Sequence, residues 1–90
     1  MASKNVFKVW VATAVDYSDT ADGKARVLGV YQTKEDAVEA ARKDMANWVD
    51  RNIEEGIKID SSKMSAYFEG DSSDGCEWNV EDAYFCFETN

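Results

Sequence analysis

The chain begins with a long apolar stretch whose side chains would alternate between two faces of a β-strand. Between Val6 and Val15, one face would carry Phe7, Val9, Val11 and Val15, and the other Val6, Trp10, Ala12 and Ala14. Successive strand residues point to opposite sides of a sheet, and here both sides are mostly apolar. The pattern therefore predicts a central strand that is covered on one side by a helix.

A polar segment follows this first strand. Residues 16–24 read Asp-Tyr-Ser-Asp-Thr-Ala-Asp-Gly-Lys, which is typical of a loop. Within it, Asp22-Gly23 is a strong signal for a hairpin turn. The next strand-like residues, Ala25–Tyr31, are expected to pair antiparallel with the first strand.

One long amphipathic helix is predicted from about residue 34 to residue 55. Thr33 and Asp36 have the spacing of a capping box, in which the hydroxyl accepts the amide hydrogen three residues later. Gly56 stands where the helix is expected to end. Small, apolar and amide residues recur at three- and four-residue spacing to form one stripe: Ala37, Ala41, Met45, Trp48, Val49 and Asn52.

The last third of the chain predicts further strands. Met64–Glu69 alternates like a half-buried strand, Gly70–Gly75 has loop composition, and Ala83–Glu88 is a strand rich in aromatic residues. Residues 76–80 also alternate, and they could form a separate strand or part of a long connection. With no repeat and no linker, residues 1–90 are predicted to form a single α+β domain. Its small antiparallel sheet of four to five strands packs on one long helix, in the order β-β-α-β-β.

Charge is distributed unevenly along this domain. Residues 1–63 hold eleven of the 18 acidic residues and all ten basic ones, whereas residues 64–90 hold seven acidic residues and no Lys or Arg. That last third also contains six aromatic residues, which can bury and hold the neighbouring carboxylates in fixed positions. A surface of this kind suits a basic site on another protein, and it argues against direct binding to nucleic acid or to an anionic membrane.

The candidate binding residues come from this acidic third. Each carboxylate could mimic a phosphate of nucleic acid, or it could be a solvated residue that aids solubility. Trp78, beside Glu77, is expected to be partly exposed as an aromatic anchor in an interface. The predicted partner-binding residues are Glu69, Asp71, Asp74, Glu77, Trp78, Glu81, Asp82 and Glu88.

Catalytic and metal-binding sites are not predicted. The chain has no histidine, which is the commonest general base and transition-metal ligand. Neither Asp-rich loop, 16–24 or 70–75, fits the ligand spacing of a calcium-binding EF-hand, and no pair of carboxylates is spaced for acid–base catalysis. Cys76 and Cys86 are expected to be free buried thiols. The alternative is a disulfide between them, which requires that their strands be neighbours. We therefore expect a non-enzymatic protein without a cofactor or a metal.

The chain resembles a class of small inhibitor proteins. No apolar run approaches the roughly 20 residues of a membrane span, and the N-terminus lacks the apolar core of a secretory signal, so a cytoplasmic protein is expected. The short chain, the pI near 4.3, the absence of His and Pro and the acidic residues 64–90 are together similar to the acidic inhibitors made by bacterial viruses, anti-CRISPR proteins among them. The resemblance is one of class, without a shared motif.

Two functions follow as expectations. The resemblance implies a phage protein in the cytoplasm of its bacterial host that blocks a basic nucleic-acid-binding protein, such as a CRISPR effector or another defence nuclease, by competing with DNA or RNA. The alternative is a small homodimeric interaction module that uses an aromatic sheet face or an edge strand. It is suggested by the aromatic residues of 83–88, which exceed what a core of this size readily hides.

Overall fold

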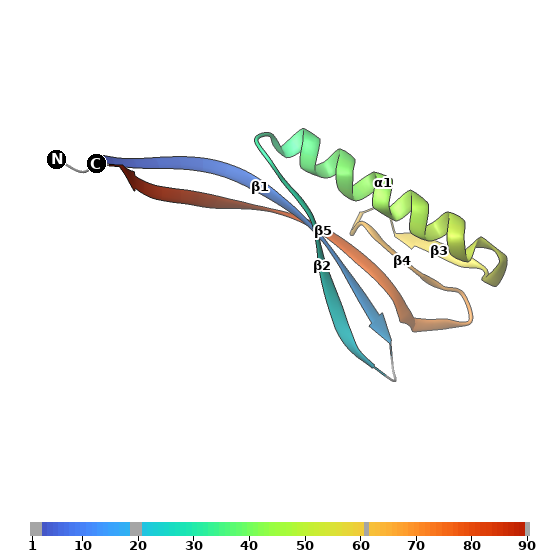
Figure 1. The fold of residues 1–90 in the computed structure, drawn as a ribbon. Coiled ribbons are helices and arrows are strands. Elements are labelled where there is room, and N and C mark those ends of the chain that lie inside the picture. The colour runs from blue at the N-terminus through green and yellow to red at the C-terminus, as the bar shows by residue number, and fades with distance from the viewer. Residues whose placement is uncertain (1–2, 19–20, 61, 90) are drawn as a thin grey trace.

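One antiparallel sheet and one helix make up the protein (Figure 1). The computed structural model describes residues 3–18, 21–60 and 62–89. In chain order the elements are β1 (Ser3–Ser18), β2 (Ala21–Tyr31), α1 (Lys34–Asn52), the short 3-10 helix η1 (Ile53–Glu55), β3 (Ile57–Asp60), β4 (Ser65–Phe68) and β5 (Asp71–Thr89). The strand order is β2-β1-β5-β4-β3, and all neighbours are antiparallel. The predicted α+β class is confirmed, and the first strand is an interior strand between β2 and β5. Three strands follow the helix, one more than in the predicted β-β-α-β-β order.

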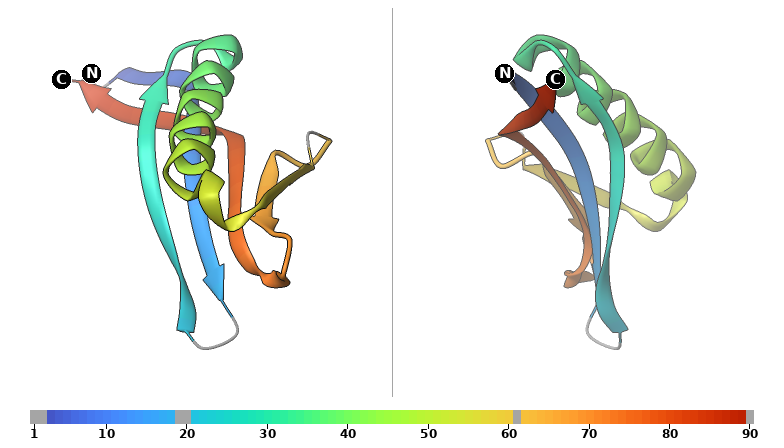
Figure 2. Two further views of the ribbon diagram at one scale, coloured as in Figure 1. Left: turned by 90° about the vertical axis from the view of Figure 1, so that its right-hand side faces the viewer. Right: turned by 60° about the vertical axis from the view of Figure 1, so that its left-hand side comes forward.

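Helix α1 packs against one face of the sheet (Figure 2). Its buried residues are Ala37, Ala41 and Trp48, which lie on the stripe predicted from the sequence. Small side chains also face the helix from the middle of the sheet, where Ala12 and Ala14 of β1 are fully buried. These alanines allow the helix to approach the sheet closely, and Trp48 fills the wider space near the end of the helix.

Local signals set the start of α1 and the end of the helical segment, as predicted, although α1 itself ends at Asn52 and residues 53–55 form η1. The hydroxyl of Thr33 accepts a hydrogen bond from the backbone N–H of Asp36 at 3.2 Å. At the other end, Gly56 has a φ of +80°, in the left-handed region that favours glycine. Its N–H donates to the carbonyl of Ile53 at 3.3 Å and closes the last turn.

The predicted hairpin turn at Asp22-Gly23 is wrong. Strand β2 already begins at Ala21, which pairs with Ser18 of β1, so Asp22-Gly23 lies inside the strand pair. Most of the predicted loop over residues 16–24 therefore belongs to strands, and its residues 19 and 20 lie outside the described part of the chain. The pairing with β1 outweighs the local turn preference of this dipeptide.

Strand β5 also replaces a predicted loop. It begins at Asp71 and continues to Thr89, so the segments 76–80 and 83–88 belong to a single strand. Its pairing with β1 runs from Gly75 opposite Tyr17 to Thr89 opposite Ser3 without a shift in register. Before this pairing begins, β5 pairs with β4, where Asp71 lies opposite Phe68 and Gly75 opposite Tyr67. These strand contacts outweigh the loop composition of 70–75, so the predicted loop is wrong.

The two cysteines occupy the same strand. Cys76 is a free, fully buried thiol, as expected, whereas the side chain of Cys86 lies outside the described part. Both residues belong to β5, and ten residues of extended chain span about 33 Å. A disulfide between them within one molecule is therefore excluded.

Candidate protein-binding surface

The sheet has one face that the helix does not cover. Residues directly opposite each other in an antiparallel pair point to the same face. Ala14 pairs with Trp78, and both are buried beneath α1, so the residues next to them in each strand point away from the helix. This open face is formed by Val11, Thr13 and Val15 of β1, Val27 and Val30 of β2, and Glu77, Asn79 and Glu81 of β5.

The open face is apolar on one side and acidic on the other. Val27 and Val30 of β2 are 69% and 59% exposed, next to the half-buried valines of β1. On the other side of β1, Glu77 and Glu81 are exposed and lie about 13 Å apart along β5. This exposed apolar strip with carboxylates at its rim makes the open face the candidate binding surface of the described residues.

The structure spreads the predicted acidic residues along β5 instead of gathering them. Glu69 and Asp71 are exposed where β4 joins β5, and Asp74 is half-buried shortly after them. Glu88 lies near the far end of β5, although its side chain is outside the described part. The distance from Asp71 to Glu88 is about 56 Å along an extended strand. These carboxylates do not converge on one point.

Alternation along β5 divides the acidic residues further. Glu81 is on the open face, but the adjacent Asp82 points to the opposite side, where its carboxylate lies 3.4 Å from the ammonium group of Lys8. B-DNA carries a charge about every 1.7 Å of its axis, far more densely than this strand does. Of the predicted residues, the open face thus brings together Glu77 and Glu81.

The prediction that Trp78 is an exposed anchor is wrong. Its side chain is 1% exposed, and its ring lies 6.0 Å from the ring of Trp48 in an edge-to-face arrangement. Trp78 is opposite Ala14, whose small side chain leaves room for a large ring beneath the helix. The alternation of β5 places Glu77 outward and Trp78 inward, so neighbours in sequence face opposite environments.

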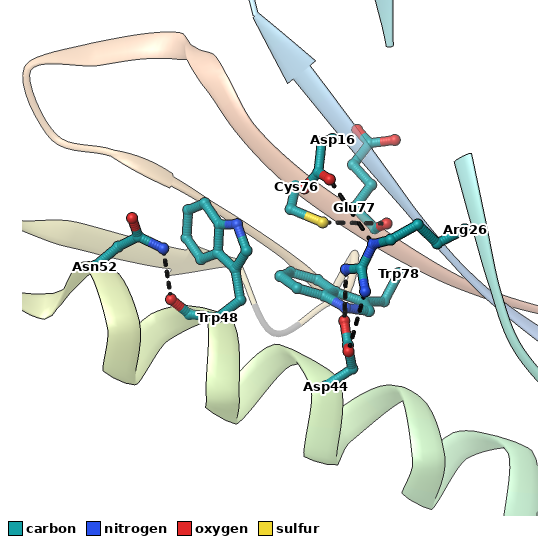
Figure 3. Close-up of polar contacts among 8 residues, drawn as sticks. All are labelled: Asp16, Arg26, Asp44, Trp48, Asn52, Cys76, Glu77 and Trp78. Atoms are coloured by element: carbon teal, nitrogen blue, oxygen red, sulfur yellow. Dashed lines mark hydrogen bonds and ion pairs between the residues drawn. The ribbon is translucent and has the colours of Figure 1, made fainter. Parts of the chain in front are cut away.

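A polar cluster at the edge of the core holds Trp78 in place (Figure 3). The indole Nε1 of Trp78 donates to the carboxylate of Asp44 at 2.8 Å, and Arg26 donates to the same carboxylate at 3.0 Å. Arg26 also lies 3.8 Å from the carboxylate of Asp16. Burial raises the pKa of Asp44, but the hydrogen bonds from Trp78 and Arg26 and the charge of Arg26 outweigh burial, so the pKa is lowered overall. The cluster joins β1, β2, α1 and β5.

Acid is expected to weaken this cluster. Because the pKa of Asp44 is lower in the folded state than its usual 3.8, the ionised carboxylate contributes stability above that value and loses it as the pH falls through the folded pKa. We expect Asp44→Asn to cost about 1–2 kcal/mol at neutral pH, since Arg26 is partly solvent-screened. Urea unfolding at pH 7 and near pH 3 should show the gap between the two proteins narrowing in acid. An equal gap at both pH values would contradict the assignment.

Other chemistry is limited in the described residues. Burial raises the pKa of the Cys76 thiol to about 12, so this thiol is protonated at neutral pH and is a poor nucleophile. Within residues 3–18, 21–60 and 62–89, no group of three or more Asp, Glu, Cys or His side chains is arranged to hold a metal ion. In the same part of the chain, no helix combines the length and apolarity that crossing a membrane requires.

Comparison of the chain with protein-family models, curated proteins and solved structures gave no match. The candidate surface therefore depends on the geometry of this molecule. The sequence prediction missed Val27 and Val30 because it assigned no faces to the second strand. The sequence did contain one signal for these residues, namely that it predicts a single helix. One helix covers one face of a sheet, so apolar residues on the other face are left exposed.

Proposed function

We propose that the protein is a non-enzymatic binding protein whose open face docks onto a basic surface of another protein. The observation that carries the proposal is the combination, on this face, of exposed Val27 and Val30 with exposed Glu77 and Glu81. The valines supply apolar contact area, and the carboxylates select a partner of positive charge and repel acidic ones.

Nucleic-acid-binding proteins are the partner class that this charge favours. They carry basic grooves that neutralise phosphates, and a chain of net charge −8 is attracted to such grooves over a long range. The proposed activity is inhibition, in which the bound protein prevents DNA or RNA from entering the groove. Because the chain resembles phage inhibitors, we propose that the specific target is a CRISPR effector or another defence nuclease in the host cytoplasm. The wide spacing of the acids along β5 favours steric blocking over a close copy of a phosphate backbone.

Charge reversal on the open face is expected to abolish this binding. In a pull-down from bacterial lysate, the tagged protein should retain a nucleic-acid-binding protein in low salt and release it in high salt. The double variant Glu77→Lys with Glu81→Lys should bind that protein about a hundredfold or more weakly, because each new lysine faces positive charge at a cost of up to several kcal/mol. Addition of DNA or RNA should displace the tagged protein.

The matched control places the same charges elsewhere. Glu35→Lys with Glu54→Lys changes the net charge equally at exposed sites on or next to α1, away from the open face, and should retain binding. Capture that resists high salt and tolerates the open-face reversal would contradict the proposal. So would a captured partner that has no affinity for nucleic acid.

A homodimeric interaction module is the second candidate function. A different part of the molecule favours it, namely the paired ends of β1 and β5, which extend beyond the rest of the sheet (Figure 1).

A further inference from the structure

The two ends of the chain form a two-stranded arm. It consists of Ser3–Trp10 of β1 paired with Asp82–Thr89 of β5. Strand β2 stops at Tyr31, opposite Trp10, and therefore flanks only the base of the arm. Figure 1 shows the arm projecting away from the helix and from β3 and β4, and the whole molecule is 60 Å long but only 26 by 20 Å across.

This arm exposes apolar side chains on both of its faces. Val6 and Tyr84 point to one face and are 58% and 68% exposed, whereas Phe7 points to the other and is 52% exposed. An isolated two-stranded ribbon is marginally stable in water at best, because each face lacks a layer to pack against. The arm is thus expected to gain stability from additional strands.

One edge of the arm is ready to accept such a strand. The N–H of Trp78 donates to the carbonyl of Met64 at 2.9 Å, on the side of β5 that faces away from β1. Because the register with β1 is unbroken and strand residues alternate, the even-numbered residues from Val80 to Glu88 direct their N–H and C=O groups to that same outer side. The pairing of β4 with β5 ends at Glu77 in the described residues, so this outer edge continues without β4.

Three of the usual protections of an exposed edge are missing here, and carboxylates are the charges that it carries. Natural edge strands are commonly blocked by proline, lysine or a bulge. The sequence contains no proline, β5 contains no lysine, and its pairing with β1 shows no register shift. A long, regular edge of this kind is a template for pairing with another strand.

Charge indicates what that other strand is. The arm contains two lysines and two acidic residues, so its own net charge is zero and the whole net charge of −8 belongs to the rest of the chain. A basic partner gains no electrostatic attraction from a neutral arm. A second copy of this acidic protein, however, meets the least repulsion there.

We propose that the arm is a self-association element through which two copies of the chain join their β5 strands edge to edge. A closed dimer with two-fold symmetry requires the same edge to meet itself, and two β5 strands then run antiparallel. The result is a four-stranded sheet in which the two β5 strands are central and the two β1 strands flank them.

The carboxylates of β5 exclude some registers of this pairing, and Tyr84 favours one of those that remain. Centring the two-fold axis on Asp82 would oppose the two copies of that residue, and centring it on Phe85 would oppose Asp82 and Glu88 of the second copy. Like charges directly opposite each other destabilise a strand pair. An axis at Tyr84 avoids both contacts and places the two exposed Tyr84 rings against each other, an aromatic pair that favours association.

Charge swapping at Tyr84 tests this arrangement directly. Sedimentation velocity over a concentration series is expected to show the natural chain dimerising, whereas Tyr84→Lys and Tyr84→Glu should each stay monomeric because like charges meet at the axis. Mixing the two variants should restore the dimer. If the mixture associates no more tightly than each variant alone, the proposed register is wrong.

Proline distinguishes edge pairing from side-chain contact. The N–H of Tyr84 points away from β1, so Tyr84→Pro removes an outward donor without removing a bond of the β1–β5 ladder. We expect its dimer dissociation constant to exceed that of Tyr84→Ala at least about tenfold. Circular dichroism checks that both variants remain folded. If Tyr84→Pro does not fold, the Tyr84→Lys and Tyr84→Glu variants still test the proposal.

Three results would overturn the proposal. The first is a natural chain that remains monomeric up to about millimolar concentration, a range in which weak specific dimers form. The second is a dimer that tolerates all the Tyr84 variants. The third is a dimer that is lost in Val27→Lys instead, which would place self-association on the open face. The Tyr84 variants leave the open face intact, so failure here is distinguishable from failure of the proposed inhibitor function.

Discussion

Trp78→Ala is expected to lower the free energy of unfolding by about 3–5 kcal/mol. The side chain of Trp78 is one of the two largest fully buried side chains of the described residues, and it contacts the ring of Trp48 beneath α1. Its removal leaves a cavity and also deprives Asp44 of the indole N–H donor. Small domains are stabilised by roughly 5–15 kcal/mol in total, so this loss is a large fraction of the stability. Urea unfolding followed by far-UV circular dichroism measures it.

Trp78→Phe separates packing from hydrogen bonding at the same position. The phenyl ring retains much of the buried volume but has no N–H for Asp44, so we expect a smaller loss of about 1–2 kcal/mol. A loss of less than about 1 kcal/mol in the free energy of unfolding of Trp78→Ala would contradict the burial of this ring in the core. Losses that small are typical of surface substitutions.

Gly75→Ala is expected to detach β4 from β5 in part and to cost about 1–3 kcal/mol or more. A Cβ at this position would lie 2.7 Å from the hydroxyl of Tyr17 and 2.8 Å from the Cα of Tyr67, and it would also collide with the carbonyl oxygen of Ala66. Two of these three atoms belong to the backbone of β4, which cannot turn aside as a flexible side chain could. Hydrogen exchange should show faster exchange of the β4 amides, and urea unfolding should give the free energy.

Gly70→Ala is the matched control for this substitution. Apart from its own residue and its two chain neighbours, a methyl group at Gly70 would have no atom within 4 Å and would meet open space. We expect a change in stability within about 0.5 kcal/mol. Equal losses in the two variants would show that general chain stiffness, and not the close approach of β4 at Gly75, determines the effect.

The sequence by itself predicted the features that depend on neighbouring residues. The hydroxyl of Thr33 accepts a hydrogen bond from the amide of Asp36 three residues later, and Gly56 adopts a backbone conformation that other residues avoid. The start of α1 and the end of the helical segment after η1 are therefore encoded locally. The stripe containing Ala37 and Ala41 follows from the helical period in the same way. The strands around residues 6–15 and 25–31 follow from their alternation and apolar content.

The candidate site was predictable only in part, because its geometry depends on which strands become neighbours. The sequence indicated that residues 64–90 carry the excess acidic charge. The sheet then placed Glu77 and Glu81 beside the valines of β1 and β2 and turned Asp82 to the other side. Trp78 was misplaced in the prediction because a tryptophan between polar residues is compatible with either face until the strand has a partner.

Only the tertiary structure decided the course of β5 and the existence of the arm. Asp22-Gly23 and the polar residues 71–75 have the local composition of turns, yet pairing with β1 and with β4 holds them in strands. The pairing of β1 with β5 joins residues as far apart as Ser3 and Thr89, and no short window of sequence contains both partners. The helix was therefore readable from the sequence because its hydrogen bonds are local. The long strands were not, because their hydrogen bonds are made with distant segments of the chain.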